Sequence, residues 1–491
     1  MLGDARRAIC LAIQEASTRE TVRQLELHQS AADLVEVRAD SIRDLDVAAV
    51  MAACEKPVIW TCRASWEGGH FEGSERRRLE VLEAGARAGA AYVDVEGASE
   101  FAASAAALLA PAKVIVSRHC FDPGLPELPA LFSELESISG NVFKVAVTPD
   151  SDEQLLQLLD EMPALLSRGN RVLIGLGERS KPARLLGALW GNCWTYASAA
   201  AGRETGPGQL TVTELREEYR LQEVPADCFF CAVVGNPVSH SLSPKLHNFW
   251  FLEKGLPGFY FALELEQFDT LVVRERCWPL RGLSVTIPHK VAALQACDFV
   301  EDSARKAGAV NTMHYRDGGW WGSNTDVEGF LTPLRARIPD LKDQNVTLLG
   351  AGGAARAAAL ALADSGCRLR IYNRNGERAG QLAADLGGEP CRWDKLDEAS
   401  GRVLVNGTAI GMRGEEPPLR LRPGQFEVVY DMVYNRRPTP LLQQAQQLGM
   451  KVIGGEEMFV EQAARQFERW TDSPLSESER RAGFERIFGN V

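Results

Sequence analysis

The chain has 491 residues, of which 45% are hydrophobic and 24% charged, and its formal net charge is −12. The length exceeds one ordinary core and predicts roughly two to four domains, with the composition of soluble globular proteins. The acidic balance argues against a nucleic-acid surface or a polybasic membrane anchor, and no apolar run of about 18 residues predicts a membrane span.

The N-terminus has neither a signal-peptide layout nor a Ser/Arg-rich transit segment, because its apolar piece, 8–13, is short and leads into charges. The eleven cysteines are scattered, many in apolar runs, as expected for reduced thiols in a cytoplasmic protein. Cys228 and Cys231 have CxxC spacing, but no second pair accompanies them. We therefore expect core packing there and no metal site.

Short apolar, β-branched segments alternate with Ala/Leu/Glu-rich helical segments over the first two hundred residues. The strand-like segments are 8–13, 34–40, 58–63, 92–96, 113–118, 142–148, 172–178 and 194–198. Alternation of this kind predicts a parallel sheet, and eight repeats predict a closed (β/α)₈ barrel.

Ionisable side chains collect at the C-terminal ends of these segments, where such barrels place their chemistry. Glu36 and Arg38 are two residues apart and share a strand face. The other ionisable residues of this kind are Arg63, Glu67, Glu96, His119, Lys144 and Arg184. Each has a structural explanation alone, such as a salt bridge in the core, but their number favours a functional site.

Lys144 lies within an apolar segment, where an ammonium group is costly to bury. Burial and nearby cations favour the neutral amine, and Arg38, Arg63 and Arg184 would supply those cations and hold an anionic substrate. A neutral amine attacks a ketone to form a Schiff base, which acts as an electron sink.

His119 is placed to move protons, and Glu67 to orient its imidazole. With Lys144, these residues predict an imine-forming lyase or aldolase that acts on a small carboxylated ketone.

The segments EVRAD, WTCRASWEGG, SRHCF, VFKVAV and GPGQL resemble type I 3-dehydroquinate dehydratase over residues 6–220. The resemblance implies that Lys144 forms the imine, that His119 is the general acid/base and that Glu67 supports it. It implies substrate contacts by Glu36, Arg38, Arg63, Arg184, Thr205 and Gln209. Cys120, Ala183 and Thr205 depart from the usual residues, which bears on rate and substrate geometry more than on reaction type.

A polar stretch, 213–227, precedes a new apolar segment and predicts a domain boundary. The motif VVGNPVSHSLSPKLHN then presents Ser241 and Ser243 just before a helix that opens at Pro244. These serines either cap that helix or bind a polyol or carboxylate ligand.

Further polar residues follow in the segments GLSVTIPHK, GAVNT and GSNTD, namely Thr286, Lys290, Asn311 and Asp326. Taken singly, Lys290 is explained as a solvated surface lysine and Asp326 as a helix N-cap.

The segment 346–375 reads strand, glycine turn, helix, strand, with Gly350, Gly352 and Ala355 in the G-x-G-x-x-A register. Glycines there let the backbone approach a pyrophosphate at the helix N-terminus. The second strand ends at Arg374, where an NAD enzyme carries Asp or Glu, and this predicts NADP. The segments 403–412 and 428–435 are predicted as later strands of the same sheet.

These motifs resemble shikimate dehydrogenase over residues 228–491. The resemblance implies that Lys290 and Asp326 are the catalytic pair. It implies that the substrate is held by Ser241, Ser243, Thr286, Asn311, Tyr434 and Gln462. It implies that the cofactor cleft is lined by Gly350, Ala351, Gly352, Gly353, Ala354, Asn373, Arg374, Met432 and Gly455.

We therefore predict a bifunctional enzyme that dehydrates 3-dehydroquinate to 3-dehydroshikimate and reduces the latter to shikimate with NADPH. The expected α/β domains are a barrel (1–222), a substrate-binding lobe (228–332 with 455–491) and a Rossmann NADP lobe (335–454). The alternatives are an imine-forming aldolase joined to another NADP reductase, a quinate-preferring dehydrogenase, and a non-catalytic regulator built from the same folds. The expected partners are small molecules, without nucleic acid or membrane, and the sequence leaves the oligomeric state open.

Overall fold

The structure is a computed structural model that describes residues 7–272, 278–434 and 437–489. The chain divides into two compact units. Unit 1 comprises Met1–Phe229 and Gly255–Pro279, and unit 2 comprises Phe230–Lys254 and Leu280–Val491.

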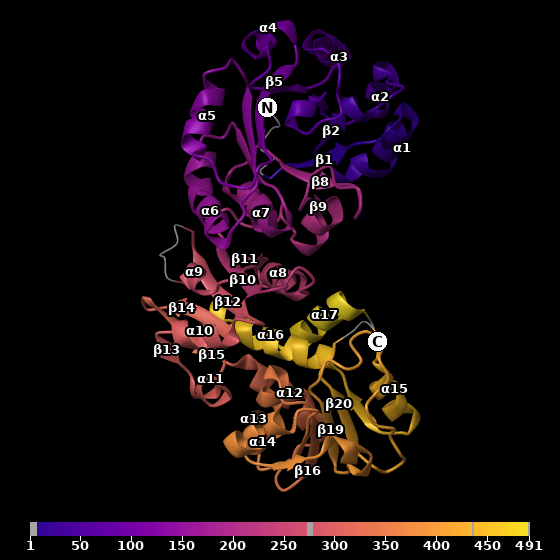
Figure 1. The fold of residues 1–491 in the computed structure, drawn as a ribbon, viewed down its shortest axis with the longest axis vertical. Coiled ribbons are helices and arrows are strands. Elements are labelled where there is room, and N and C mark those ends of the chain that lie inside the picture. Colours follow the sequence, from indigo (N-terminus) through magenta and orange to yellow (C-terminus); the bar gives the residue numbers. More distant parts are fainter. Residues whose placement is uncertain (1–6, 273–277, 435–436, 490–491) are drawn as a thin grey trace. The chain divides into compact units, whose positions relative to one another are not determined.

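Unit 1, in which Figure 1 labels β1, β2, β5, β8 and β9, contains a parallel sheet in the order β7-β6-β5-β4-β3-β2-β1-β8-β9. Its first eight strands follow the eight predicted segments, and their order is that of a (β/α)₈ barrel, which confirms the predicted fold. The strands are β1 (Ile9–Ile13), β2 (Leu34–Arg38), β3 (Val58–Thr61), β4 (Tyr92–Glu96), β5 (Lys113–Cys120), β6 (Val142–Val147), β7 (Arg171–Gly175), β8 (Thr195–Ser198) and β9 (Leu210–Thr211).

The two ends of the eight-strand order, β7 and β8, meet across a seam bridged by a side chain. The Asn192 side chain accepts a hydrogen bond from the Leu173 N–H (2.7 Å) and donates one to the Leu173 carbonyl (3.1 Å). The Cys193 N–H also donates to the Arg171 carbonyl (3.1 Å). The Asn192 amide thus replaces one rung of the backbone ladder where the barrel closes.

Helices follow the barrel strands as the alternating pattern predicts. Several begin at serine N-caps, because the hydroxyls of Ser17, Ser74 and Ser151 each accept a hydrogen bond from the N–H three residues later. The helices are α1 (Thr18–His28), α2 (Val47–Ala53), α3 (Glu75–Arg87), α4 (Ala105–Leu108), α5 (Leu128–Glu136), α6 (Asp152–Leu166) and α7 (Lys181–Trp190). Unit 1 also contains β11 (Gly258–Glu264) and α9 (Asp269–Val272).

Alternation along the barrel strands sets which side chains face inward. Leu34, Tyr92 and Val142 belong to one buried apolar cluster inside the barrel. Two residues later on the same strands stand Glu36, Asp94 and Lys144, so these charged groups share the inward faces. The barrel interior is therefore apolar in one layer and ionic in the next.

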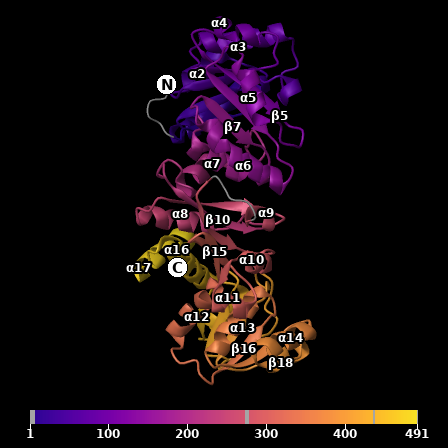
Figure 2. The same ribbon diagram turned by 90° about the vertical axis from the view of Figure 1, so that its left-hand side faces the viewer.

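Unit 2 begins with five strands of a mixed sheet, which follow one another in the order β10-β12-β14-β15-β13. β10 and β12 are parallel, whereas β12, β14 and β15 are antiparallel neighbours. These strands are β10 (Phe229–Gly235), β12 (Leu280–Val285), β13 (Phe299–Val300), β14 (Thr312–Arg316) and β15 (Gly319–Ser323). The accompanying helices are α8 (Ser243–Glu253), α10 (Lys290–Ala296), α11 (Asp302–Ala307), α16 (Gly455–Thr471) and α17 (Glu477–Phe488). The C-terminal helices α16 and α17 pack against α8 (Figure 2).

The second sheet of unit 2 is parallel and runs in the order β18-β17-β16-β19-β20-β21. Numbered from β16, this order is 3-2-1-4-5-6, that of a dinucleotide-binding doubly wound sheet, and it confirms the predicted Rossmann fold. The strands are β16 (Asn345–Leu349), β17 (Arg368–Tyr372), β18 (Glu389–Cys391), β19 (Val403–Asn406), β20 (Val428–Asp431) and β21 (Lys451–Ile453). The helices are α12 (Thr325–Arg337), α13 (Gly353–Asp364), α14 (Gly376–Leu386) and α15 (Pro440–Gln447).

Two predicted strands of this sheet were too long. The predicted segment 403–412 ends as a strand at Asn406, because the Asn406 side chain accepts hydrogen bonds from Thr408 and donates to the Ile410 carbonyl. The predicted segment 428–435 ends as a strand at Asp431, and its residue 435 lies outside the described residues. Both apolar patterns continue into loops at the carboxyl edge of the sheet.

Candidate active sites

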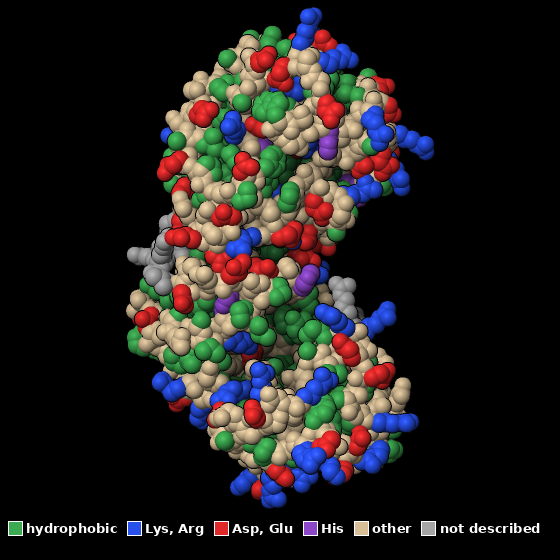
Figure 3. Space-filling model, in the orientation of Figure 1, with side chains coloured by type: hydrophobic (Ala, Val, Ile, Leu, Met, Phe, Trp, Pro, Cys, Tyr) green, Lys and Arg blue, Asp and Glu red, His purple; other side chains and the backbone are tan. Residues whose placement is uncertain are grey.

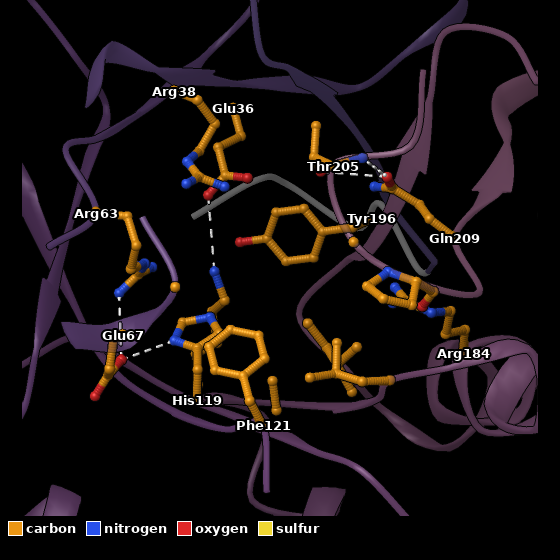
Figure 4. A pocket seen from close by; sticks show the side chains of 17 residues that line it. Glu36, Arg38, Arg63, Glu67, His119, Phe121, Arg184, Tyr196, Thr205 and Gln209 are labelled. Carbon is orange, nitrogen blue, oxygen red and sulfur yellow. Dashed lines mark hydrogen bonds and ion pairs between the residues drawn. The ribbon is translucent and has the colours of Figure 1, made fainter. Parts of the chain in front are cut away.

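The nine barrel residues predicted to act in catalysis or substrate binding line one cavity of about 250 Å³ at the C-terminal ends of the strands (Figure 4), whereas Glu96, also named from the sequence, is not among the residues that line it. The nine are Glu36, Arg38, Arg63, Glu67, His119, Lys144, Arg184, Thr205 and Gln209. Residues from at least five different strands and their loops thus converge on one point, as the barrel topology requires.

Lys144 lies on β6 and is only 3% exposed. Its Nζ is 2.9 Å from Asp94 Oδ2 and 3.7 Å from Glu36 Oε1. The three predicted arginines line the same cavity, but the nearest charged partners of this amine are two carboxylates. These two carboxylates hold the amine at the cavity wall.

Arg63 links the lysine site to a buried ionic chain. Its guanidinium is 2.8 Å from Asp94 and 3.1 Å from Glu96, and Glu96 in turn accepts a short hydrogen bond from Arg78, which is fully buried. Burial alone would raise the pKa of Asp94, but Arg63, Lys144 and His119 outweigh it and lower that pKa. Asp94 is therefore ionised, and it holds both cations in place.

His119, at the end of β5, contacts Glu67 through its Nδ1, which is 2.9 Å from Glu67 Oε2. Burial, with the charges of Arg63 and Lys144, lowers the pKa of His119 well below its usual value. Burial raises the pKa of Glu67 to about 7, although Arg63 opposes the rise. The imidazole is therefore neutral near pH 7, and with its Nδ1 occupied by Glu67 its other nitrogen is free to act as a base.

Arg184 is a buried cation with no carboxylate within 4 Å among the described residues. Its Nη2 donates to the Pro207 carbonyl (3.0 Å), and its buried Nε has no hydrogen-bond partner in the same part of the chain. Burial lowers its pKa to about 10, so it is still charged at neutral pH. Arg38, by contrast, is already paired with Asp40 at 2.8 Å. Arg184 is thus the predicted arginine best suited to bind an anionic substrate group.

The loop after β8 closes one side of the cavity. Gln209 Oε1 accepts hydrogen bonds from the backbone N–H (2.8 Å) and the hydroxyl (3.2 Å) of Thr205. Gly208 has φ +72°, and a Cβ there would lie 2.1 Å from the Gly177 carbonyl oxygen. The GPGQL segment therefore needs glycine at this position to bring Thr205 and Gln209 to the cavity.

Asp94, Tyr196 and Phe121 belong to this site and were not predicted. Asp94 binds Lys144, and the rings of Tyr196 and Phe121 line the cavity. The signal for Asp94 was available, because an aspartate in the middle of the apolar strand YVDVE is as unusual as Lys144 in its own strand. Tyr196 carries no comparable signal, since an aromatic residue is ordinary in a strand.

Unit 2 has its own cavity, of about 500 Å³, and the face beside α16 is hollowed, with hydrophobic side chains inside (Figure 3). It is lined by all predicted catalytic and substrate-binding residues of this half: Ser241, Ser243, Thr286, Lys290, Asn311, Asp326, Tyr434 and Gln462. Of the predicted cofactor residues, Ala354, Met432 and Gly455 also line it. His240, Ser284 and Gln466 line it as well and were not predicted.

Lys290 and Asp326 form an ion pair with 2.6 Å between Nζ and Oδ2. Lys290 opens α10, and Asp326 lies in the first turn of α12. The N-cap of α12 is Asn324, whose side chain accepts from the Asp326 N–H (3.2 Å), so the Asp326 carboxylate is free for another role. Asn311 donates to Asp326 Oδ1 (2.8 Å) and fixes its orientation. The N-cap explanation of Asp326 is therefore wrong.

The two serines are not side-chain caps of α8. The N-cap position of that helix is Leu242, with no side-chain capping bond, and the Ser241 hydroxyl accepts a hydrogen bond from the Ser243 N–H (3.3 Å). Nearby, the Tyr434 ring stacks on Phe459 at 5.2 Å between centroids. These groups give the cavity hydroxyl groups on one side and aromatic surface on the other.

The glycine turn after β16 fits a dinucleotide. Gly350 has φ +105°, and a Cβ at Gly352 or Gly353 would project into open space with nothing within 4 Å. Helix α13 begins at Gly353, and its N-cap, Gly352, offers no side-chain capping bond. Its first backbone N–H groups and this open space can therefore receive a pyrophosphate. Ala351, another of the predicted cofactor residues, lies in the same turn.

Two residues predicted to bind the cofactor follow the end of β17. Asn373 and Arg374 follow this strand directly, and Arg374 is exposed, with its guanidinium carbon 5.7 Å from the centroid of the Trp393 ring. Trp393 was not predicted as part of the site. It gives Arg374 a preferred position beside the sheet edge.

The fold and the two sites define the class of protein: an imine-forming barrel enzyme joined to an NAD(P)-dependent dehydrogenase of two lobes. Family models match along the chain in the same order. Type I 3-dehydroquinase matches residues 9–225, the shikimate dehydrogenase substrate-binding domain 233–313, shikimate/quinate 5-dehydrogenase 334–410, and the shikimate 5'-dehydrogenase C-terminal domain 455–477.

Relatives of known name share both halves. The chloroplastic bifunctional 3-dehydroquinate dehydratase/shikimate dehydrogenase of Arabidopsis thaliana is 34% identical, over 91% of this chain and 79% of that protein. The shikimate biosynthesis protein AroDE of Chlamydia pneumoniae is 27% identical, over 94% of this chain and 95% of that protein. A solved shikimate dehydrogenase in complex with NADP⁺ is 32% identical, with a TM-score of 0.50, over 54% of this chain and 97% of that one. The chain belongs to the bifunctional 3-dehydroquinate dehydratase/shikimate dehydrogenase family.

The helices and the ionisable side chains of residues 7–272, 278–434 and 437–489 have two further properties. No helix among them combines the length and apolar character that a bilayer span needs. No group of three or more His, Cys, Asp or Glu side chains in the same residues is arranged to hold a metal ion.

Proposed function

We propose that the barrel dehydrates 3-dehydroquinate to 3-dehydroshikimate and that unit 2 reduces 3-dehydroshikimate to shikimate with NADPH. The observation that carries the proposal is the barrel cavity, in which a buried amine, a neutral imidazole and an arginine without a carboxylate partner meet. These groups suit a ketone, an acidic C–H bond and a carboxylate, which together describe a small cyclic keto acid.

In the barrel, Lys144 gives up a proton and its nitrogen bonds to the ketone carbon, and the carbonyl oxygen leaves as water. The resulting iminium draws electrons from the neighbouring C–H bond, whose proton His119 accepts. Loss of the β-hydroxyl group, protonated by the same imidazole, returns the electron pair to the carbon chain and leaves a conjugated iminium. Water then hydrolyses this iminium and releases the enone and Lys144.

The substrate-holding roles follow from the contacts of each side chain. Arg184 binds the carboxylate, and Gln209 and Thr205 close the site from the loop after β8. Glu36, Arg38 and Arg63 line the same cavity and set its charge. Glu67 keeps the His119 ring oriented and stabilises the imidazolium that forms during proton transfer.

In unit 2, Lys290 and Asp326 handle the proton of the hydroxyl group, and Asn311 holds Asp326 in position. The hydroxyls of Ser241, Ser243 and Thr286, with Tyr434 and Gln462, orient the ring of the substrate. NADPH, when bound, supplies the hydride. Gly350, Ala351, Gly352, Gly353, Ala354, Asn373, Arg374, Met432 and Gly455 would hold it.

The domain boundaries that fit this function are 1–222 for the barrel, 228–332 with 455–491 for the substrate lobe, and 335–454 for the NADP lobe. We also propose a cytosolic location, supported by the ten cysteines of the described residues, all of which are free thiols. Two consecutive reactions in one chain raise the local concentration of the intermediate. This increase does not by itself establish direct transfer of the intermediate between the two sites.

A coupled assay tests the function as a whole. The full chain is mixed with 3-dehydroquinate and NADPH, and the loss of NADPH absorbance is followed while shikimate is identified by mass spectrometry. Oxidation of NADPH only when 3-dehydroquinate or 3-dehydroshikimate is present supports the proposal. An absence of turnover with either compound would favour an imine-forming aldolase joined to another NADP reductase. A preference for quinate in the reverse direction would favour a quinate-preferring dehydrogenase.

The Glu67–His119 pair predicts a pH dependence for the dehydratase. Because the pKa of Glu67 is raised to about 7 and that of His119 is lowered, acid protonates Glu67 first and removes the charge that supports the imidazolium. We expect kcat of dehydration to fall as the pH drops through about 7. Glu67→Gln should lower kcat at pH 8 roughly 10- to 100-fold and lack this acid limb. If kcat of Glu67→Gln still falls as the pH drops through about 7, another titrating group causes the decrease.

Arg374 predicts the choice between NADPH and NADH. Removing its charge-assisted contacts to a 2′-phosphate should cost roughly 10- to 100-fold in affinity. We expect Arg374→Asp to lower the ratio of kcat/KM for NADPH over NADH by that factor. Arg368→Asp, the same charge change at the other end of β17, is the matched control and should leave the ratio unchanged. An unchanged ratio in Arg374→Asp would refute its assignment.

A further inference from the structure

The ring of Tyr196 faces the catalytic amine. Lys144 Nζ lies 4.6 Å from the centroid of this ring, within the range of a cation–π interaction. Tyr196 is on β8, is 5% exposed, and lines the same cavity as Lys144 and His119. In Figure 4 its ring occupies the middle of the ionisable side chains around the cavity. A second aromatic contact, with Trp194 at 6.4 Å and an angle of 79° between the rings, holds the ring in place.

The hydroxyl group of Tyr196 does not explain why this residue is here. Its oxygen is buried and has no hydrogen-bond partner among the described residues. An unpartnered buried hydroxyl stabilises nothing and costs its desolvation. The part of Tyr196 that the structure places against Lys144 is the face of its ring.

Formation of the imine changes what can solvate the nitrogen. The ammonium form has three N–H donors, which can serve Asp94, Glu36 and water, whereas an iminium has a single N–H. The substrate also fills a cavity of about 250 Å³ and excludes water from it. An aromatic face needs no N–H to attract a cation, and the attraction is stronger in a dry site than in a wet one. The ring thus contributes more to the adduct than to the free enzyme.

We propose that Tyr196 is a catalytic residue of the dehydratase site, whose ring face stabilises the iminium cation formed at Lys144. The inference rests on the proposed imine at Lys144 and deepens it. Positive charge appears on the nitrogen when the carbinolamine loses water and again when the β-hydroxyl group leaves, so the ring acts at both steps.

Borohydride trapping measures this effect directly, because hydride reduces the iminium to a stable secondary amine. The full chain is titrated with 3-dehydroshikimate, reduced, and weighed by intact mass spectrometry. We expect Tyr196→Leu to raise the ligand concentration for half-maximal trapping roughly tenfold. Tyr196→Phe, which keeps the aromatic face, should rescue trapping to within about threefold of the wild type. Tyr219→Leu, the same loss of a buried tyrosine ring at a residue that does not line the cavity, is the matched control and should trap like the wild type.

Quinate distinguishes this role from simple packing, since it has a hydroxyl group in place of the ketone and forms no imine. Its inhibition constant should stay within about twofold in Tyr196→Leu. The proposal is overturned if trapping and quinate binding weaken together, if Tyr196→Leu traps like the wild type, or if Tyr196→Phe is as poor as Tyr196→Leu.

A series that preserves shape covers the case in which Tyr196→Leu fails to fold, as shown by loss of the shikimate dehydrogenase activity of the same chain. Phenylalanine carrying zero, one, two or three fluorine atoms is placed at position 196, and each fluorine weakens the negative face of the ring. Trapping should weaken stepwise along the series, and a flat series refutes the proposal. Peptide mapping of the wild-type adduct keeps the two proposals apart: an adduct away from Lys144 refutes the imine assignment, whatever Tyr196 does.

Discussion

Replacing Lys144 by alanine is expected to abolish dehydration of 3-dehydroquinate and the adduct that borohydride traps. The side chain supplies the nucleophile itself, and removal of a covalent catalyst costs roughly 10⁵-fold or more in kcat. Water in the enlarged cavity cannot replace an electron sink. Product formation by ultraviolet absorbance and intact mass after reduction are the two measurements.

The same substitution leaves Asp94 and Glu36 buried without the amine that pairs with them. Removing one partner of a buried ion pair costs about 3–5 kcal/mol of stability, so Lys144→Ala alone mixes a catalytic with a structural effect. Lys144→Arg keeps a cation next to Asp94 and forms no imine, and it should be as inactive as Lys144→Ala but more stable. The dehydrogenase activity of the same chain reports folding. Appreciable dehydration by Lys144→Arg would exclude the imine mechanism.

Replacing Lys290 by alanine is expected to stop reduction of 3-dehydroshikimate while dehydration continues. The 2.6 Å pair with Asp326 places its ammonium at the cavity, where it can deliver the proton that the reduced carbonyl oxygen needs. Loss of a positioned acid or base costs about 10²- to 10⁴-fold in kcat. Asp326→Asn should act in the same direction, because it removes the group that orients Lys290. Initial rates of shikimate oxidation with NADP⁺ measure both variants.

A second lysine–aspartate pair in unit 2 provides the control for that experiment. Lys306 and Asp364 lie 3.2 Å apart on the surface, away from the residues that line the cavity. Lys306→Ala makes the same chemical change and should leave kcat and KM as in the wild type. A loss in Lys306→Ala similar to that in Lys290→Ala would mean that the effect comes from stability and not from proton transfer.

The sequence predicts the barrel well because each strand carries a local signal. Buried parallel strands read as short apolar runs between helical segments, and all eight runs became strands of the first sheet. The closure of that sheet has no such signal. The Asn192 amide that bridges Leu173 lies in a turn where asparagine is common, and only the three-dimensional register shows which backbone groups it meets.

Some residues of the two sites also carry a local signal in the sequence, and others do not. A lysine in an apolar strand, or an arginine after a cofactor-binding strand, stands out against its neighbours. The partners of such residues come from other strands, and their pairing depends on register. Asp94 lies on β4, 50 residues before Lys144, and Tyr196 on β8, so neither contact could be assigned from the chain order alone.

The position of Asp326 shows a different limit. From the sequence, an aspartate at the start of a helix is most simply a cap, because a side-chain oxygen there satisfies free N–H groups. In the structure Asn324 takes that role two residues earlier, and Asp326 is released to pair with Lys290. The GSNTD segment contains several polar residues, and local propensity alone does not show which of them caps the helix.

The lone guanidinium of Arg184 has a practical consequence for handling the protein. A cavity with a buried positive group binds compact oxyanions. Phosphate, sulfate or citrate in a purification buffer therefore competes there with the keto acid. Ions that bind only the folded chain also increase its resistance to heat by mass action. Zwitterionic amine buffers with chloride as the counter-ion keep this position open, so melting curves and inhibition constants measured in them describe the enzyme itself.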